Sequence, residues 1–394
     1  MVGNLIILYF CLDNFELNLL EDFSKGFLIF QYFFLINEWG FNLYALENIK
    51  PNIKKINIQV INEIIFSKIL IGMACFLLIS LLLFFDIFSF NNSYMPFFLT
   101  FIIFSSALNP LWFFQAIGKI ELLNSPYLFL RLAQIIIFYM FINILGVGLF
   151  FILQGIIFIS LFLFNLHTLK HQYGYTMKIN LSNCLLGLSG INKMKFYFLS
   201  NVHNHLNLTL WGIVLLVTSS PIQIIIFNLV DTIYRGINAI YQSIIEPIFR
   251  EFELSLKNSI YATTFLAIFF ILIYYSMPFL TNLFFPKYSN DLIDIFKLLS
   301  IVLATLFISK VFTYLYLGKN NIKQMNRFNI QFLFIEIILV FAWFLFMQNN
   351  VKEIIILLFF LNLGKIFLLT LGKLFTKNIK TPKTPKTPKT PKIS

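Results

Sequence analysis

The chain has 394 residues, of which 59% are hydrophobic and 12% are charged. A water-soluble protein of this length cannot bury so large an apolar fraction, so the sequence predicts an integral membrane protein and excludes a soluble enzyme. A net charge of +12 would indicate nucleic acid as the partner of a soluble protein, but here it fits basic cytoplasmic loops, and we expect no nucleic-acid partner.

Long apolar segments follow one another along almost the whole chain. About 20 apolar residues cross a hydrocarbon core of roughly 30 Å as a helix, and the continuous, non-alternating runs exclude spanning strands. The sequence therefore predicts an all-α integral membrane fold with about 11 full transmembrane helices. The expected spans are 26–48, 64–88, 96–117, 126–144, 147–166, 196–218, 222–248, 259–284, 294–318, 328–348 and 354–375.

Positive charge alternates between the loops that join these spans. Every second loop carries Lys or Arg, and the loops between them carry almost no charge. Because cytoplasmic loops are enriched in Lys and Arg, this pattern places the basic loops and the C-terminus in the cytoplasm. The basic loop residues include Lys50, Lys54, Lys55, Lys119, Lys170, Lys178, Lys193, Lys195, Arg250, Lys257, Lys319, Lys323 and Arg327.

The longest cytoplasmic connection, 167–195, divides the chain into two parts. It has amphipathic character, so we expect it to lie on the membrane surface as a linker. It separates an N-terminal helix bundle, 1–166, from a C-terminal bundle, 196–376. The tail, 377–394, contains four TPK units, which predict a disordered extended segment or, alternatively, an electrostatic tether to anionic lipid.

The stretch 107–123 combines polar residues with an apolar helix end. Pro110 lacks a backbone N–H and opens the helix locally, while Trp112, Gln115 and Lys119 are spaced to share one helix face. Such a stripe fits an interfacial anchor or a face turned toward other helices and water. We favour Trp112 and Gln115 at the entrance of a cavity, and Lys119 also fits a simple anchor.

A polar stripe runs along the whole of segment 222–248 at steps of three or four residues. Interhelical polar contacts contribute only about 1 kcal/mol each, so a stripe of this length exceeds what helix association needs and predicts a water-filled central cavity. Asp231 and Arg235 are spaced to pair within the helix. The stripe comprises Asn228, Asp231, Arg235, Asn238, Gln242 and Glu246.

The predicted cavity is mainly basic. Arginine presents a planar fork that suits phosphate oxygens, while Asn, Gln and aromatic side chains suit sugars, so the expected cargo is a phosphate- or pyrophosphate-bearing sugar. Its expected lining is Trp112, Gln115, Arg131, Asn204, Asn207, Arg235, Asn238, Gln242 and Lys310. The counter-charges or proton-coupling carboxylates are Asp231, Glu246 and Glu336.

Motifs for catalysis or metal binding are weak. The chain has no P-loop, no GxSxG and no HExxH, and its three cysteines form no CxxC. His167 and His171 are spaced to bind a metal but have no third ligand nearby. We therefore expect no catalytic residue, no metal and no cofactor.

Three sequence blocks together are similar to a known family. The first is 37–42 with Gly40-Phe41, the second is 109–116 followed by Arg131, and the third is 231–248. In content, order and spacing they resemble blocks of the O-antigen flippases, the Wzx-type polysaccharide transporters of the MOP exporter superfamily. The likeness covers roughly 22–376.

This resemblance implies two six-helix bundles of MOP/MATE-like architecture around a central cationic cavity, with alternating access. It implies a flippase of undecaprenyl-pyrophosphate-linked oligosaccharide in the bacterial inner membrane, driven by a proton or sodium gradient, with membrane lipids, a polysaccharide polymerase and a chain-length regulator as partners. Members of the family begin with a complete span, so we interpret Met1–Leu12 as the outer end of a truncated first span and Asp13–Asp22 as an outward loop.

Two other functions fit a membrane protein of this kind. A polysaccharide polymerase or glycosyltransferase would place acid/base residues on a large outward loop, but the outward loops here are short and nearly uncharged. A drug exporter of the same superfamily would favour an acidic cavity, because its cargo is usually cationic.

Overall fold

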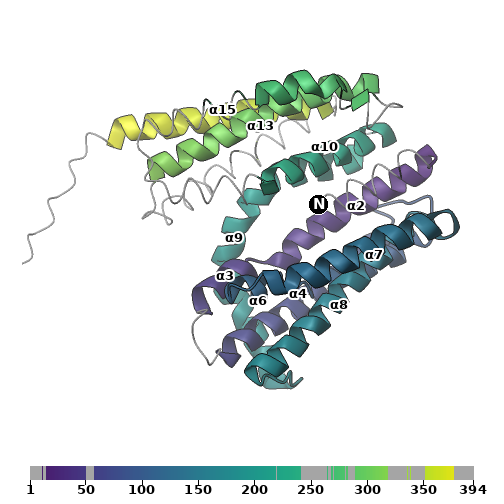
Figure 1. The fold of residues 1–394 in the computed structure, drawn as a ribbon, viewed down its shortest axis with the longest axis vertical. Coiled ribbons are helices and arrows are strands. Elements are labelled where there is room, and N and C mark those ends of the chain that lie inside the picture. The colour runs from purple at the N-terminus through teal and green to yellow at the C-terminus, as the bar shows by residue number, and fades with distance from the viewer. Residues whose placement is uncertain are drawn as a thin grey trace, which may run out of the picture.

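In the computed structural model, all regular secondary structure of the described residues is helical (Figure 1). The described residues are 11, 15–49, 57–218, 220–240, 264, 268, 270–279, 281–282, 289–317, 335, 338 and 351–376. Four of their helical segments are long and apolar enough to cross a membrane: Ile58–Phe84, Met95–Ala116, Glu121–Ile142 and Gly148–Tyr173. The prediction of an all-α protein with membrane-type helices is confirmed for these residues.

The helices follow the predicted spans in order. They are α2 (Leu17–Glu38), α3 (Phe41–Asn48), α4 (Ile58–Phe84), α5 (Met95–Ser106), α6 (Leu111–Ala116), α7 (Glu121–Leu145), α8 (Gly148–Tyr173), α9 (Leu181–Thr218), α10 (Pro221–Ile240), α13 (Ser289–Leu317) and α15 (Val351–Thr376). The expected spans 259–284 and 328–348 fall mostly outside the described residues, as does the tail 377–394.

Two expected spans are broken into two helices. The first breaks at Trp39 and Gly40, which have positive φ values of 26° and 72°. The second breaks before Pro110, which cannot donate the hydrogen bond that would continue the helix. Both breaks lie at the same end of the bundle, where Asn109 contacts Glu38.

The acidic segment does not form the outward loop that we expected from Asp13 to Asp22. Helix α2 begins at Leu17, and Asp22 lies buried within it. The Asp22 carboxylate accepts backbone N–H bonds from Asn91 at 2.9 Å and Asn92 at 2.8 Å. Its charge therefore fixes the loop between α4 and α5, and the hydropathy pattern missed this because the partners are far apart in sequence.

The connection between the two predicted bundles is mostly helical. Helix α8 continues to Tyr173 and α9 begins at Leu181, so only 174–180 of the expected linker 167–195 is irregular. The Tyr175 hydroxyl donates to Asn62 Oδ1 at 2.6 Å, and burial raises the pKa of Tyr175 to about 12. The first half of α9 packs along α4, with Ser67 Oγ donating to the Gly187 carbonyl at 2.7 Å.

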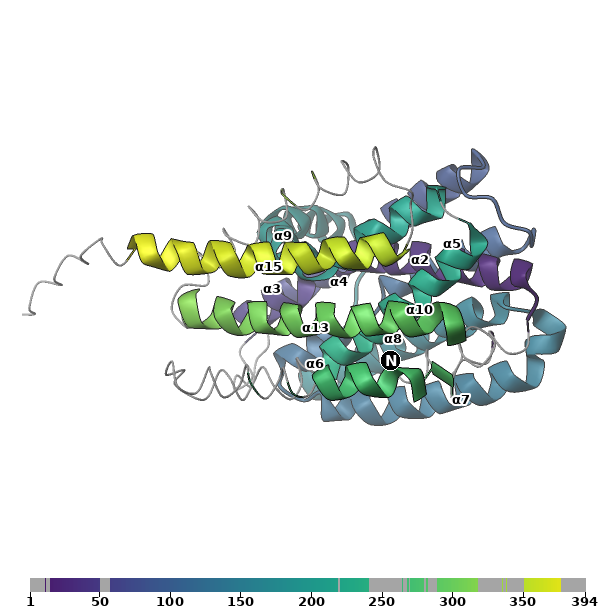
Figure 2. The same ribbon diagram turned by 90° about the horizontal axis from the view of Figure 1, so that it is seen from above.

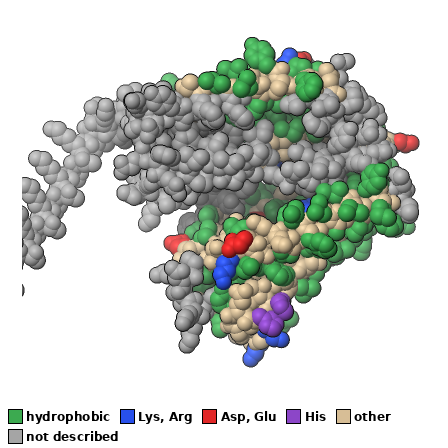
Figure 3. All heavy atoms as spheres, viewed as in Figure 1, with side chains coloured by type: hydrophobic (Ala, Val, Ile, Leu, Met, Phe, Trp, Pro, Cys, Tyr) green, Lys and Arg blue, Asp and Glu red, His purple; other side chains and the backbone are tan. Residues whose placement is uncertain are grey.

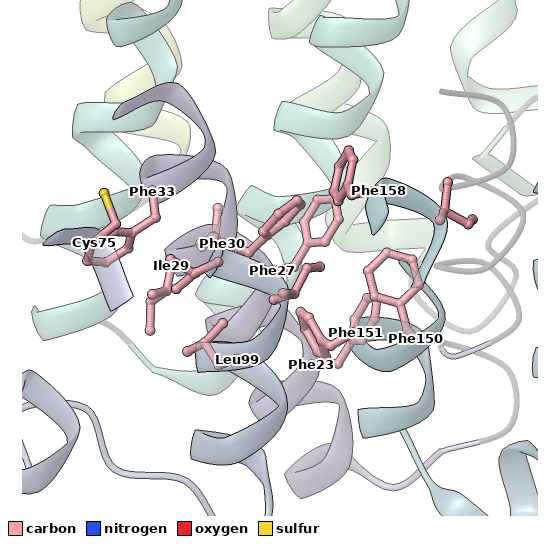
Figure 4. Packing of buried hydrophobic residues seen from close by; sticks show 14 of the residues in the cluster. Phe23, Phe27, Ile29, Phe30, Phe33, Cys75, Leu99, Phe150, Phe151 and Phe158 are labelled. Carbon is pink, nitrogen blue, oxygen red and sulfur yellow. The ribbon is translucent and has the colours of Figure 1, made fainter. Parts of the chain in front are cut away.

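Phenylalanine rings form the core between α2 and α8 (Figure 4). The ring centroids of Phe23 and Phe150 lie 5.3 Å apart, and those of Phe27 and Phe150 lie 5.8 Å apart. Edge-to-face pairs at such distances contribute roughly 0.5–1.5 kcal/mol beyond burial. This aromatic core fixes α2 at the centre of the first half of the molecule.

Helix α10 joins the second half of the molecule to α2. It packs against α2 on one side and against α13 and α15 on the other, and α13 and α15 lie side by side (Figures 1 and 2). Helix α9 runs antiparallel to α2, because Tyr197 adjoins Gly40 whereas Gly212 adjoins Leu28. Since α10 returns directly from the end of α9, it runs parallel to α2.

Candidate functional site

Arg131 is held between α7 and α8 by three oxygen atoms. Its Nε donates to the Tyr127 hydroxyl at 2.9 Å, and one terminal nitrogen donates to Gln134 Oε1 at 2.7 Å and to Gln154 Oε1. Tyr127, Arg131 and Gln134 are spaced to share a face of α7, and Gln154 reaches across from α8. Each glutamine is 2% exposed. Buried polar groups thus orient a half-buried arginine inside an apolar helix pair.

The charge of Arg131 is chemically significant because of its surroundings. The three side chains named above, which accept hydrogen bonds from the cationic guanidinium group, are themselves neutral. Only 17% of an apolar 18-residue stretch of α7 is buried inside the molecule. Hydrophobic side chains cover the visible face of this helix (Figure 3). The planar guanidinium group of an arginine suits an anion such as a phosphate.

Asp231 and Arg235 form the predicted pair on α10. Arg235 Nε lies 2.7 Å from Asp231 Oδ2, with the Asp231 side chain 1% exposed and that of Arg235 23% exposed. The spacing of four residues places both on one face, as the sequence indicates. Asn228, one turn earlier, is fully buried. The described part of the polar stripe therefore lies inside the molecule.

The sequence analysis missed a buried ionic cluster of Glu38, Lys68 and Asn109. Asn109 Nδ2 donates to Glu38 Oε1 at 3.0 Å, and Lys68 Nζ lies 3.7 Å from the same oxygen. Lys68 Nζ also sits 4.7 Å from the centroid of the Phe41 ring. The available signal was a lysine within an apolar run, which is costly in a membrane and needs a partner.

The first two blocks of the family resemblance meet at this cluster. Asn37 Nδ2 donates to the Ile103 carbonyl at 2.8 Å and to Ser106 Oγ at 2.7 Å, beside the Asn109–Glu38 contact. Block 37–42 thus contacts block 109–116 through Glu38 and Asn109. These polar contacts join the end of α2 to the end of α5 and to Lys68 within α4.

The same end of α2 also contacts α9. The Trp39 ring stacks on Phe198 with centroids 4.0 Å apart, and its Nε1 donates to the Ile191 carbonyl at 3.3 Å. Lys193 Nζ lies 2.7 Å from Glu63 Oε1, and Tyr44 donates to the other oxygen of that carboxylate at 2.8 Å. These contacts fix the beginning of α9 to the first half of the molecule.

The prediction that Lys119 shares a helix face with Trp112 and Gln115 is wrong, although Trp112 and Gln115 both lie in α6. Helix α6 ends at Ala116, and Gly118 has a φ of 68°, so Lys119 lies in the following turn and is exposed. Trp112 is 2% exposed and packs edge-on against Phe113. Gln115 is half-buried. The helix ends before Lys119 because the chain turns at Gly118, where a positive φ is readily adopted by glycine.

Several predicted site residues cannot be placed from the described residues. The backbones of Asn204, Asn207, Asn238 and Lys310 lie in helices, but their side chains fall outside the description. Gln242, Glu246 and Glu336 lie outside the described residues altogether. The structure thus brings Arg131 together with polar partners and Asp231 with Arg235, and it leaves the remainder of the predicted lining as a prediction.

The described residues offer no metal centre. His167 and His171 have ring centroids 4.3 Å apart at the end of α8, but no three His, Cys, Asp or Glu side chains of the described residues are grouped to hold a metal ion. No family model, curated protein or solved structure matches the chain.

Proposed function

We propose that this chain is a flippase that moves an undecaprenyl-pyrophosphate-linked oligosaccharide across the bacterial inner membrane by alternating access. The observation that carries the proposal is Arg131, a positive charge that Gln134, Gln154 and Tyr127 orient within a pair of apolar helices. A lipid-linked cargo needs such a charge at membrane depth for its pyrophosphate, while its tail stays in the bilayer.

Arg235 supplies a second positive charge, on the other half of the molecule. Its partner Asp231 is almost fully buried, whereas Arg235 itself is partly exposed. A pyrophosphate can therefore compete with the carboxylate for the guanidinium, because both present oxygen acceptors to the same planar fork. Two arginines on separate helices suit a diphosphate better than a cationic drug.

The proposed activity is transport, with no chemical step on the sugar. Equal binding of cargo on both sides gives no net flow, so an ion gradient or removal of the product must bias the cycle. In this proposal the basic ends of α6, α8 and α9 face the cytoplasm, and a polymerase and a chain-length regulator consume the flipped unit. Membrane lipids complete the surroundings of α7.

The test is complementation of a strain that lacks the flippase of its own polysaccharide. The wild-type chain should restore surface polysaccharide, and Arg131→Glu and Arg235→Glu should not. Lys170→Glu, at an exposed residue near the end of α8, is the matched control for a charge reversal and should restore it. Full restoration by both arginine variants, at normal protein levels, would contradict the proposal.

The accumulated intermediate separates a flippase from a polymerase. Loss of flipping leaves single lipid-linked repeat units on the cytoplasmic leaflet, whereas loss of polymerisation leaves them on the outer leaflet. An outer-leaflet accumulation in cells that carry Arg131→Glu would therefore favour the polymerase instead.

A further inference from the structure

The first turns of α9, residues 181–195, carry an exposed apolar stripe. Leu181, Leu185 and Leu188 are 78%, 58% and 56% exposed, and steps of four and three residues place them on one face of the helix. The opposite face packs against α4, where a Cβ added at Gly187 would lie 2.9 Å from the Phe66 carbonyl carbon. The stripe is therefore turned away from the rest of the molecule.

A lysine lies at each end of this stripe. Lys178 precedes Leu181 by three residues in the irregular connection to α9, and Lys195 follows Leu188 by seven, two turns further along the same face. Both lysines are exposed. The sequence contains no Asp or Glu from residue 122 to residue 230. No carboxylate of α9 therefore offsets the positive charge of this face.

The stripe lies at the level where α2 ends. Ser67 of α4 donates a hydrogen bond to the Gly187 carbonyl of α9 at 2.7 Å, and the next residue, Lys68, faces Glu38 at the end of α2. The alternation of loop charge predicts that this end adjoins the cytoplasmic headgroups. At such a depth leucines reach below the lipid phosphates, while ammonium groups on long side chains stay beside them.

The charge of the face favours an anionic lipid over other occupants. A second copy of the chain would bring like-charged lysines together. Zwitterionic headgroups carry no net charge, whereas an anionic phospholipid offers a phosphate to the lysines and acyl chains to the leucines. Each lysine beside a membrane surface raises the affinity for anionic lipid about fivefold.

We propose that the face formed by Lys178, Leu181, Leu185, Leu188 and Lys195 is a binding site for an anionic phospholipid. The two ammonium groups hold the phosphate, and the leucines contact the acyl chains. Because α9 leads from the first half of the molecule to α10, the bound lipid fixes the start of this connecting helix at the membrane surface. The inference concerns bulk lipid and stands independently of the cargo of the proposed flippase.

Lipid binding to the purified full-length chain in neutral detergent tests the site, with native mass spectrometry as the measurement. Phosphatidylglycerol should bind about tenfold or more tightly than phosphatidylcholine. Lys178→Gln and Lys195→Gln should each weaken phosphatidylglycerol binding about fivefold and leave phosphatidylcholine binding unchanged. Leu185→Ser should weaken the binding of both lipids, because an apolar contact does not depend on the headgroup. Glycerol phosphate, the headgroup alone, should not displace the lipid.

Lys170 on α8 provides the matched control, because it is an exposed lysine outside the proposed face. Lys170→Gln removes the same charge and should keep the affinity for phosphatidylglycerol. A loss in Lys170→Gln as large as in the two site variants would show a general charge effect and overturn the assignment. Equal affinity of the wild-type chain for both lipids, or unchanged affinity in both lysine variants, would also overturn it.

Two further outcomes separate this site from other ligands and from the flippase. Full displacement by glycerol phosphate would indicate a site for free phosphate and contradict the lipid site. A wild-type chain that prefers phosphatidylglycerol through these lysines but restores no polysaccharide contradicts the flippase and supports the lipid site. A chain that restores polysaccharide and binds both lipids equally contradicts the lipid site alone.

Discussion

Asn109 donates a hydrogen bond to Glu38 across the junction of α2 with the α5–α6 connection, at 3.0 Å. The same carboxylate oxygen faces the buried Lys68 ammonium of α4 at 3.7 Å. Two helices, α2 and α4, and the α5–α6 connection are thus held together by one carboxylate. Because both charges are buried, the loss of either one leaves the other uncompensated.

We expect Glu38→Leu to destabilise the protein by about 3–5 kcal/mol, because Lys68 then remains buried without its counter-charge. The double variant Glu38→Leu with Lys68→Met removes both charges and should recover most of that loss. Thermal unfolding in detergent or nanodiscs measures both. Additive losses in the double variant would show that the two residues are not coupled.

Gly40 should tolerate no side chain. Its φ is 72°, and a Cβ would lie 2.6 Å from the Tyr197 carbonyl carbon and 2.7 Å from the Phe198 nitrogen. We therefore expect Gly40→Ala to cost more than about 1 kcal/mol, from strain together with displacement of α9. Gly364→Ala on α15, where nothing lies within 4 Å, is the control and should be neutral or slightly stabilising. Equal Tm values for wild type and Gly40→Ala would refute the close contact with α9.

Alkaline pH should weaken the contact between Tyr175 and Asn62. Burial raises the pKa of Tyr175 to about 12, whereas an unfolded tyrosine ionises near 10. Between pH 10 and 12 the folded state therefore keeps the Tyr175 proton that the unfolded state loses. The free energy of unfolding falls over this range as pH rises, by up to about 3 kcal/mol. Tyr175→Phe lacks this step, so its unfolding free energy should change less over that range. Parallel pH profiles for the two proteins would contradict the assignment.

Hydropathy alone predicts much of the helical framework. Helices α4, α7, α8, α10, α13 and α15 overlap their expected spans, because an apolar run of sufficient length has few other structures in a membrane. The pairing of Asp231 with Arg235 also follows from local spacing. Local rules therefore succeed where the partners lie on the same helix.

Tertiary partners could not be predicted in this way. Glu38, Lys68 and Asn109 belong to different helices and connections, and nothing in their separate positions identifies the contact. The charge of Asp22 suggests a position in a loop. The residue is nevertheless buried, because the backbone N–H groups of Asn91 and Asn92 donate hydrogen bonds to its carboxylate. The helix break at Trp39 and Gly40 was likewise not predicted, whereas the break before Pro110 follows from the missing N–H of proline.

The most direct test of the flippase proposal is to measure the sidedness of the lipid-linked oligosaccharide in spheroplasts. A membrane-impermeant sugar-oxidising reagent labels only the outer leaflet. Cells with the wild-type chain should show most of the oligosaccharide labelled, and cells with Arg131→Lys should keep part of this labelling. Arg131→Glu should lower the labelling about tenfold or more, which is the equivalent of about 1.4 kcal/mol. Equal labelling with the wild-type chain, with Arg131→Glu and without any flippase would contradict the proposal.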